Sequence, residues 1–164
     1  MPADADVTSP SGDITVEEVP LEVVLRLRAR ILRAGRPLEA ARSKQDPLPG
    51  TLHLAARAAD GRVVGVVTLF PENTELAGDR RAYRFRGMAV DDALQGRGIG
   101  RALMRALVRM ARDAGAEVLW ANGRDSALGF YERIGFRTVG DGFVDDEMHL
   151  GHHVVIAGID EVDA

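Results

Sequence analysis

Apolar residues recur every three or four positions in three stretches of the chain, which is the spacing of one buried helical face. In the second stretch, Ile99, Leu103 and Leu107 share a face with Met110 and Ala114. A glycine follows each stretch, where helices often end. The predicted helices are residues 18–34, 99–114 and 127–134, followed by Gly35, Gly115 and Gly135.

Shorter runs rich in β-branched or aromatic residues are typical of strands. Between two of them, Asp60-Gly61 predicts a tight hairpin turn. Residues 36–50 and 71–80 are rich in turn-forming residues and predict loops. The predicted strands are residues 51–58, 63–70, 82–90, 118–121, 136–139 and 147–157.

The order of these elements predicts an α/β (α+β) fold. The first three strands form an antiparallel meander, and the later strands alternate with helices. This arrangement gives a mixed central sheet of six to seven strands with helices on both faces. In the middle strand, Tyr83, Phe85 and Gly87 are expected to share one face. Because no repeat or linker interrupts the pattern, residues 14–160 predict a single domain.

Targeting features are not evident in the sequence. Residues 1–13 lack the positive start and apolar stretch of a secretory signal, and their composition predicts a disordered tail. Residues 160–164 are expected to fray. No apolar run approaches the roughly 18 residues that a membrane span needs, so we expect no membrane partner.

Composition narrows the chemistry. The chain has no cysteine, which excludes disulfides, thiolate nucleophiles and cysteine-ligated metal sites and is compatible with a cytoplasmic location. The formal net charge of -4 argues against nucleic-acid binding, because a phosphate-tracking surface needs clustered positive charge. Charge is nevertheless uneven: residues 20–44 carry a net +5 and residues 141–164 a net -7. Two interpretations remain open, namely two solvated faces that attract each other and an acidic rim that attracts a cationic amine.

A glycine-rich loop, Gln95-Gly96-Arg97-Gly98-Ile99-Gly100, joins a predicted strand to a predicted helix. Glycines let a ligand approach the backbone, and the helix start offers unpaired N–H groups and a positive dipole end. The loop therefore suits a pyrophosphate. A Walker A loop is excluded because its lysine is missing, and the glycine spacing does not fit a dinucleotide-binding fold.

The spacing Gln95-x-x-Gly98-x-Gly100 resembles the acyl-CoA loop of the GCN5-related N-acetyltransferase (GNAT) superfamily. The resemblance covers roughly residues 50–157. It includes the end of the middle strand, Gly87-Met88-Ala89-Val90, and a histidine near the last strand, His152. A second signature matches at Asn122, Ala127, Phe130, Tyr131, Gly135 and Phe136.

The resemblance implies a GNAT-like fold and an N-acetyltransferase in which the amine of a small molecule or peptide attacks acetyl-CoA directly. It implies no metal and leaves a homodimer open. In this family the middle strand separates from the next parallel strand, and the freed backbone groups of Met88 and Val90 bind the pantetheine arm. The cofactor-binding residues implied are Met88, Ala89, Val90, Gln95, Gly96, Arg97, Gly98, Ile99, Gly100, Arg101 and Asn122.

Two polar residues of the second signature have alternative roles. Tyr131 matches the family's general acid, which protonates the departing thiolate; alternatively it is a core tyrosine whose hydroxyl meets a carbonyl. Asn122 matches a residue that binds the pantetheine or an ordered water; alternatively it caps the following helix.

The general base is harder to assign. Many family members use a glutamate on the middle strand, but here that strand carries no carboxylate. The candidates are His152, His149 and Glu147, since a histidine can accept a proton at neutral pH. His53 is expected to be structural. A metal shared by His152 and His153 is not expected, because adjacent strand residues point to opposite faces.

Two other functions remain open. One is transfer of a longer acyl group, which depends on the depth of the acyl pocket. The other is a non-catalytic acyl-CoA sensor that retains the loop but does not turn over. Tyr131 argues against the sensor, and the missing glutamate argues for it.

Overall fold

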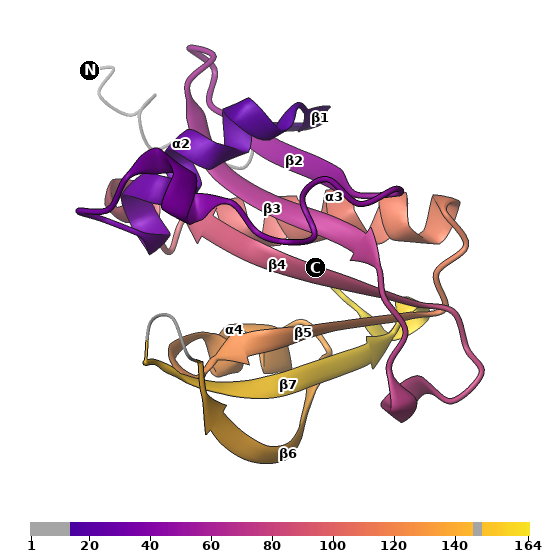
Figure 1. The fold of residues 1–164 in the computed structure, drawn as a ribbon. Coiled ribbons are helices and arrows are strands. Elements are labelled where there is room, and N and C mark those ends of the chain that lie inside the picture. The colour runs from indigo at the N-terminus through magenta and orange to yellow at the C-terminus, as the bar shows by residue number, and fades with distance from the viewer. Residues whose placement is uncertain (1–13, 146–148) are drawn as a thin grey trace. The chain divides into compact units, whose positions relative to one another are not determined.

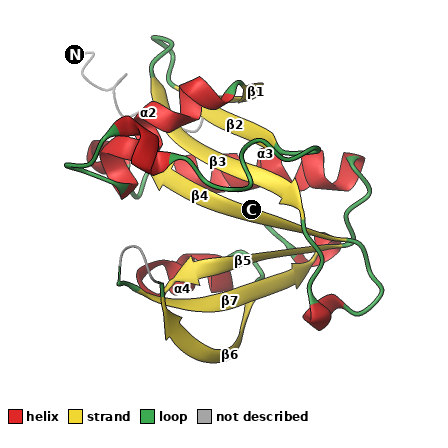
Figure 2. Cartoon of the chain, viewed as in Figure 1, coloured by secondary structure: helices red, strands yellow, loops and turns green. Residues whose placement is uncertain are grey.

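The computed structural model of the chain describes residues 14–145 and 149–164. Within these ranges, seven strands form one sheet in the order β1-β2-β3-β4-β5-β7-β6 (Figures 1 and 2). Three α-helices of the described residues connect or flank the strands. The chain forms two compact units: Met1–Phe70 with Gly87–Leu107, and Pro71–Arg86 with Val108–Ala164. The mixed seven-stranded sheet confirms the predicted fold class. The predicted tail, residues 1–13, lies outside the described residues, and the single domain stays a prediction.

Strands of the first unit pair antiparallel. β2 pairs with β1 on one edge and with β3 on the other. The turn between β2 and β3 is the predicted hairpin, in which the Arg62 N–H donates to the Asp60 side chain at 2.9 Å. The bounds are Thr15–Val19 for β1, Leu52–Arg57 for β2 and Val63–Pro71 for β3.

Helices cover both faces of these strands. On one face, Val24 and Leu27 of α2 (Leu21–Leu32) belong to a buried cluster with Val66 of β3. On the other face lies the first part of α3 (Ile99–Asp113). A Cβ on Gly65 would meet Ile99 at 2.8 Å, so the missing side chain lets the helix pack against β3. The placement of α2 and α3 on opposite sides is visible in Figure 1.

In the second unit, β4 (Ala82–Val90) begins beside β5 (Val118–Arg124) as a parallel pair. β7 (Gly151–Gly158) pairs antiparallel with β5 on one edge and with β6 (Arg137–Val144) on the other. The alternation of these strands produces two faces. One carries an apolar cluster that includes Trp120 and Ile156, and the other faces the aromatic residues of α4.

The aromatic cluster fixes α4 (Leu128–Arg133), which follows a 3₁₀ turn at Asp125–Ala127. Tyr131 lies at the centre of the cluster, with its ring centroid 5.7 Å from that of Phe85 and 5.9 Å from that of Phe136. The helix is therefore held against β4 by ring packing.

Several element boundaries differ from the prediction. β1 was not expected, because its residues are mostly exposed and carry Glu17 and Glu18; it is an edge strand whose Glu17 pairs with Arg57 at 2.6 Å. Helix α2 begins only at Leu21, after Pro20 has ended that strand. The tail of the chain does not simply fray: residues 159–161 form a 3₁₀ turn, and Asp163 N–H donates to Ile134.

The later strands are longer or shorter than expected. β6 does not stop at residue 139 but continues past a register irregularity to Val144, because Gly140 adopts a positive φ of 76° there. β7 begins at Gly151 and not at Glu147, which lies outside the described residues. The predicted alternation of β4 is interrupted at Gly87, whose φ is 67°, and Ala89 is the buried residue beyond it. Ala114 follows the end of α3 and is exposed.

Candidate active site

The glycine loop is shaped by its own side chains before any ligand binds. Asp91 accepts a hydrogen bond from the Ala93 N–H at 3.0 Å and so caps a 3₁₀ turn over residues 92–94. Gln95 then folds back, and its Nε2 donates to the Val90 carbonyl at 3.3 Å. The loop therefore leaves β4 along a defined path.

The glycines of this loop adopt conformations that other residues rarely reach. Gly96 has φ 82° and Gly98 has φ 85°, both in the left-handed region. A Cβ on Gly96 would meet no atom within 4 Å, so one side of the loop is open. Helix α3 starts immediately afterwards, and Ala102 is the first residue whose N–H reaches back to Gly98, at 3.0 Å.

The start of α3 therefore offers the N–H groups of residues 99–101 to an anion. Arg97 and Arg101 are exposed beside them, whereas the side chain of Ile99 is buried in the core and leaves only its backbone for a ligand. The residues present fit a pyrophosphate, because open space, left-handed glycines and a helix N-terminus coincide. Met88 and Val90 are half-buried and Ala89 is buried.

His53 belongs to a buried polar network in the same unit. Arg28 donates to Asp46 at 2.9 Å and to the Thr68 hydroxyl at 2.7 Å, and Nδ1 of His53 lies 2.9 Å from that hydroxyl. Burial lowers the pKa of His53 below 6.5, which keeps the ring neutral. Its contacts are those of the structural residue that we expected.

Asp46 is the anionic member of this network. Burial alone would raise its pKa, but the hydrogen bond from Arg28, aided by the Ser43 N–H, outweighs burial and holds the pKa below 3.8. Nε of Arg28 is buried without a partner among the described residues. Gly87 lies beside it, since a Cβ there would come within 3.2 Å of that nitrogen.

In the second unit, Tyr131 is 6% exposed, and its hydroxyl forms no hydrogen bond with any described residue. The carbonyl partner of the structural alternative is therefore not found in the described part of the chain. Gly123 of β5 lies against the ring, because a Cβ there would come within 3.1 Å of it. Burial raises the pKa of Tyr131 to about 12, and the charge of Arg124 opposes this rise.

Asn122 lies inside β5 and is exposed. The helix-cap alternative is wrong, because β5 extends to Arg124 and the N-cap of α4 is Ala127. The sequence did not indicate this extension, since Asn122-Gly123 resembles a turn. Within this unit, the parallel ladder from β4 to β5 ends at the pair Arg84 and Trp120, although β5 continues.

His152 is held in one tautomer. Its Nδ1 lies 2.8 Å from the Leu150 carbonyl, which can only accept, so Nδ1 carries the proton and Nε2 keeps its lone pair in the neutral ring. Asp145 lies 3.9 Å away, and the Phe143 ring stacks on the imidazole. Across the ladder His152 pairs with Arg124.

Strand register places the predicted acid and base on different sides. His152 shares its face of the sheet with Asn122, since both lie at alternate positions of paired strands. Tyr131 packs against Gly123, whose position belongs to the opposite face. The structure thus brings Asn122 and His152 to one face of β5 and β7, and Tyr131 to the other.

The sequence interpretation missed one histidine pair. Nδ1 of His153 lies 2.7 Å from the Asp125 carboxylate, and no sequence signal connects two residues 28 positions apart. His149 is exposed with a positive φ of 56°, and Glu147 lies outside the described residues. Among residues 14–145 and 149–164, no three His, Asp or Glu side chains form a group that could hold a metal. No helix in these ranges is long and apolar enough to cross a membrane.

Comparison with known proteins assigns the family. The model of the acetyltransferase (GNAT) family matches residues 21–136, more than half of the chain. The chain belongs to this GNAT family. It is an acyltransferase of the N-acetyltransferase type, and the family uses acyl-CoA as its co-substrate. The match runs from the first helix through the glycine loop to the aromatic cluster.

Individual GNAT relatives match different shares of the chain. The uncharacterized N-acetyltransferase YitI of Bacillus subtilis is 27% identical over 143 residues, covering 87% of this chain and 94% of that protein. Glucosamine 6-phosphate N-acetyltransferase of Trypanosoma brucei brucei is 31% identical over 78 residues, covering 48% of this chain and 53% of that protein. A GCN5-related N-acetyltransferase of Kribbella flavida has the same fold, with a TM-score of 0.68 at 21% identity over 90% of this chain and 98% of that one.

Proposed function

We propose that this protein transfers an acetyl group from acetyl-CoA to the primary amine of a small molecule or peptide, by direct attack and in the cytoplasm. The glycine loop carries the proposal: two left-handed glycines, open space and the start of α3 coincide at one place. These features fit the pyrophosphate of acetyl-CoA. Gln95, Gly96, Arg97, Gly98, Ile99, Gly100 and Arg101 would bind it, and Met88, Ala89, Val90 and Asn122 would hold the pantetheine arm.

Nε2 of His152 is proposed to accept the proton that the attacking amine must lose. The Leu150 carbonyl supports this role, because it fixes the proton on Nδ1 and leaves the lone pair on Nε2. Asp145, at 3.9 Å from Nδ1, would stabilise the imidazolium that forms. Glu147 lies outside the described residues, and no hydrogen bond among the described residues prepares the His149 side chain as a base.

Tyr131 is proposed to donate its proton toward the departing sulfur from the face of β5 opposite His152, so that the sulfur and the attacking amine are approached from different sides. With a pKa of about 12 it stays protonated throughout the neutral range. Complete transfer to a thiolate of pKa about 8.5 would cost roughly 5 kcal/mol, so the main contribution is a hydrogen bond to the sulfur as charge develops. Arg124 favours the ionised form of Tyr131 and therefore reduces that cost.

The sensor remains the second candidate because β4 carries Arg84 and Arg86 where a carboxylate would be expected. Thiol release from acetyl-CoA over a panel of primary amines separates the two functions. We expect turnover with at least one amine, and a Gly98→Val variant that stays folded but no longer binds acetyl-CoA, since a β-branched side chain is strained at φ 85°. Binding without turnover of any amine would support the sensor, and a longer acyl-CoA that outperforms acetyl-CoA would replace the acetyl assignment.

A further inference from the structure

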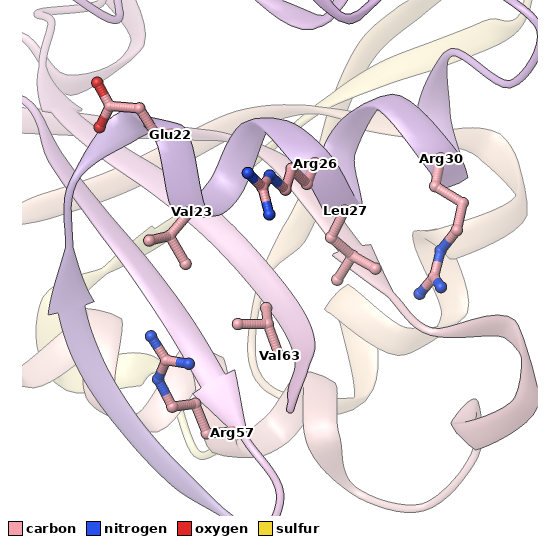
Figure 3. A pocket seen from close by; sticks show the side chains of 7 residues that line it. All are labelled: Glu22, Val23, Arg26, Leu27, Arg30, Arg57 and Val63. Carbon is pink, nitrogen blue, oxygen red and sulfur yellow. The ribbon is translucent and has the colours of Figure 1, made fainter. Parts of the chain in front are cut away.

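A pocket of about 570 Å³ lies in the first unit, between helix α2 and the hairpin of β2 and β3 (Figure 3). Its volume falls within the range of small-molecule sites, about 300–1,000 Å³. None of the residues assigned to acetyl-CoA or to catalysis lines it. The lining consists of three apolar residues, Val23, Leu27 and Val63, and four charged ones, Glu22, Arg26, Arg30 and Arg57.

Two of the three arginines are already held in place. Nη2 of Arg30 pairs with Asp91 at 3.1 Å, and Nε of Arg57 pairs with Glu17 at 2.6 Å. Both ion pairs are partly exposed to solvent and occupy only part of each guanidinium. In Figure 3 the guanidinium of Arg57 extends from β2 toward α2.

Arg26 differs from its neighbours because it forms no hydrogen bond or ion pair with any described residue. In Figure 3 its side chain lies along α2, with the guanidinium on the side of Val23. A guanidinium has five N–H donors in a fork that matches a carboxylate. Arg26 thus offers its whole fork to a ligand, and the nitrogens that Arg30 and Arg57 do not use can add further donors.

The other lining residues define the rest of the ligand. Val23, Leu27 and Val63 provide apolar surface from two different elements, which favours an aliphatic or aromatic body over a bare inorganic ion. Glu22 lies at the N-terminal end of the same helix and repels a second negative charge. A single anionic group on an apolar body satisfies both conditions.

We propose that this pocket binds a small organic monoanion, with the anionic group on Arg26 and the apolar body against Val23, Leu27 and Val63. The basic character of residues 20–44 then has a specific use, since Arg26 and Arg30 belong to that segment. The proposal does not depend on acetyl transfer, because none of these residues has a role in it.

Calorimetric titration with 4-phenylbutyrate and with its neutral amide, 4-phenylbutanamide, tests the site on the full chain. We expect the acid to bind about tenfold more tightly than the amide, the lower end for a hydrogen bond to a charged group. Arg26→Gln should remove most of this preference. Arg109→Gln is the matched control, an exposed α3 arginine that does not line the pocket, and should keep it.

Three results would overturn the proposal: no binding of the acid, equal binding of acid and amide, or the same loss in both arginine variants. A further titration in saturating acetyl-CoA separates a dedicated anion site from the phosphates of the co-substrate. We expect 4-phenylbutyrate to bind in its presence. Complete displacement would assign the pocket to acetyl-CoA itself and would also overturn the proposal.

Discussion

Both compact units contain polar side chains packed among core residues, but the hydrogen bonding of these side chains differs. In the first unit, Arg28, Asp46, Thr68 and His53 form a continuous network, and nearly every polar atom in it has a partner. In the second unit, the hydroxyl of Tyr131 has no partner among the described residues. Both arrangements sit beneath a helix that packs on the sheet.

This difference distinguishes a polar group that stabilises the fold from one that can take part in a reaction. In this network only Nε of Arg28 lacks a partner among the described residues, so little is left for a ligand. Losing the Asp46 carboxylate would leave an uncompensated charge. The Tyr131 hydroxyl has no protein partner among the described residues and is not among their fully buried atoms, so it is free to bond a substrate atom. Substitutions in the network of the first unit should therefore lower stability, whereas substitution of Tyr131 in the second unit should lower the reaction rate.

The largest effect is expected in the first unit. Asp46→Ala leaves the Arg28 charge buried without its carboxylate, at 5% side-chain exposure, and should lower the free energy of unfolding by about 3–5 kcal/mol. Denaturant unfolding measures this loss. Asp160→Ala, which removes an exposed ion pair with Arg112, is the control and should change little. Equal effects in both variants would contradict a structural role for the network.

Tyr131→Phe should affect the reaction and hardly affect stability. It removes one oxygen and retains the ring packing, so kcat should fall by roughly 100-fold, which is the lower end of a general-acid contribution. KM for acetyl-CoA should move little, because the lost interaction belongs to the transition state. A folded variant whose kcat stays within about twofold of the parent, where chemistry limits the rate, would exclude this role.

Alkaline pH should test the burial of the same hydroxyl. The pKa of Tyr131 is raised to about 12 in the fold, against about 10 in an unfolded chain, so the stabilisation is complete below pH 10 and is lost as pH rises through 12. The loss amounts to about 2.7 kcal/mol at most. Unfolding curves measured across this pH range give the free energy of unfolding. In Tyr131→Phe this free energy should no longer show the decrease that Tyr131 causes. An unchanged alkaline slope in the variant would show that the hydroxyl is hydrated.

Gly123→Ala should have the smallest effect. The new Cβ would come within 3.1 Å of the Tyr131 ring, so the ring must move by a few tenths of an ångström. Such overpacking costs about 1 kcal/mol, and the displaced hydroxyl should lower kcat a few-fold. Gly129→Ala, on the exposed side of α4, is the matched control and should keep kcat. If both variants have the parent's kcat, the position of Tyr131 is less restricted than its packing suggests.

The sequence predicted those parts of the fold that depend on local patterns. Apolar spacing found α3, the Asp60-Gly61 turn fixed the hairpin, and the glycine loop lies between β4 and α3 as expected. Edge strand β1 escaped prediction because an exposed, acidic strand has no buried alternation. Positive φ at Gly87 and Gly140 also changed strand patterns that look regular in the sequence.

The candidate site shows the same limit. Motif spacing selected Tyr131 and His152, but their local surroundings depend on residues far away in the sequence. The His153 pair with Asp125 and the contact of Gly123 with Tyr131 arise from strand register, which a single sequence does not display. The roles of Tyr131 and His152 therefore remain predictions, and the hydrogen bond of His152 to Leu150 gives one of them a defined geometry to test.

Each compact unit consists of two chain segments, and this has a consequence for biosynthesis. The first unit includes residues 1–70, but its core also needs Ala89 and the start of α3. The ribosome must add the 37 residues between Phe70 and Leu107 before that unit is complete, which takes roughly 2–7 s at about 5–20 residues per second. During this interval the face of β3 opposite α2 is not yet covered by α3. A nascent chain stalled before Leu107 should consequently be a preferred target for chaperones and proteases.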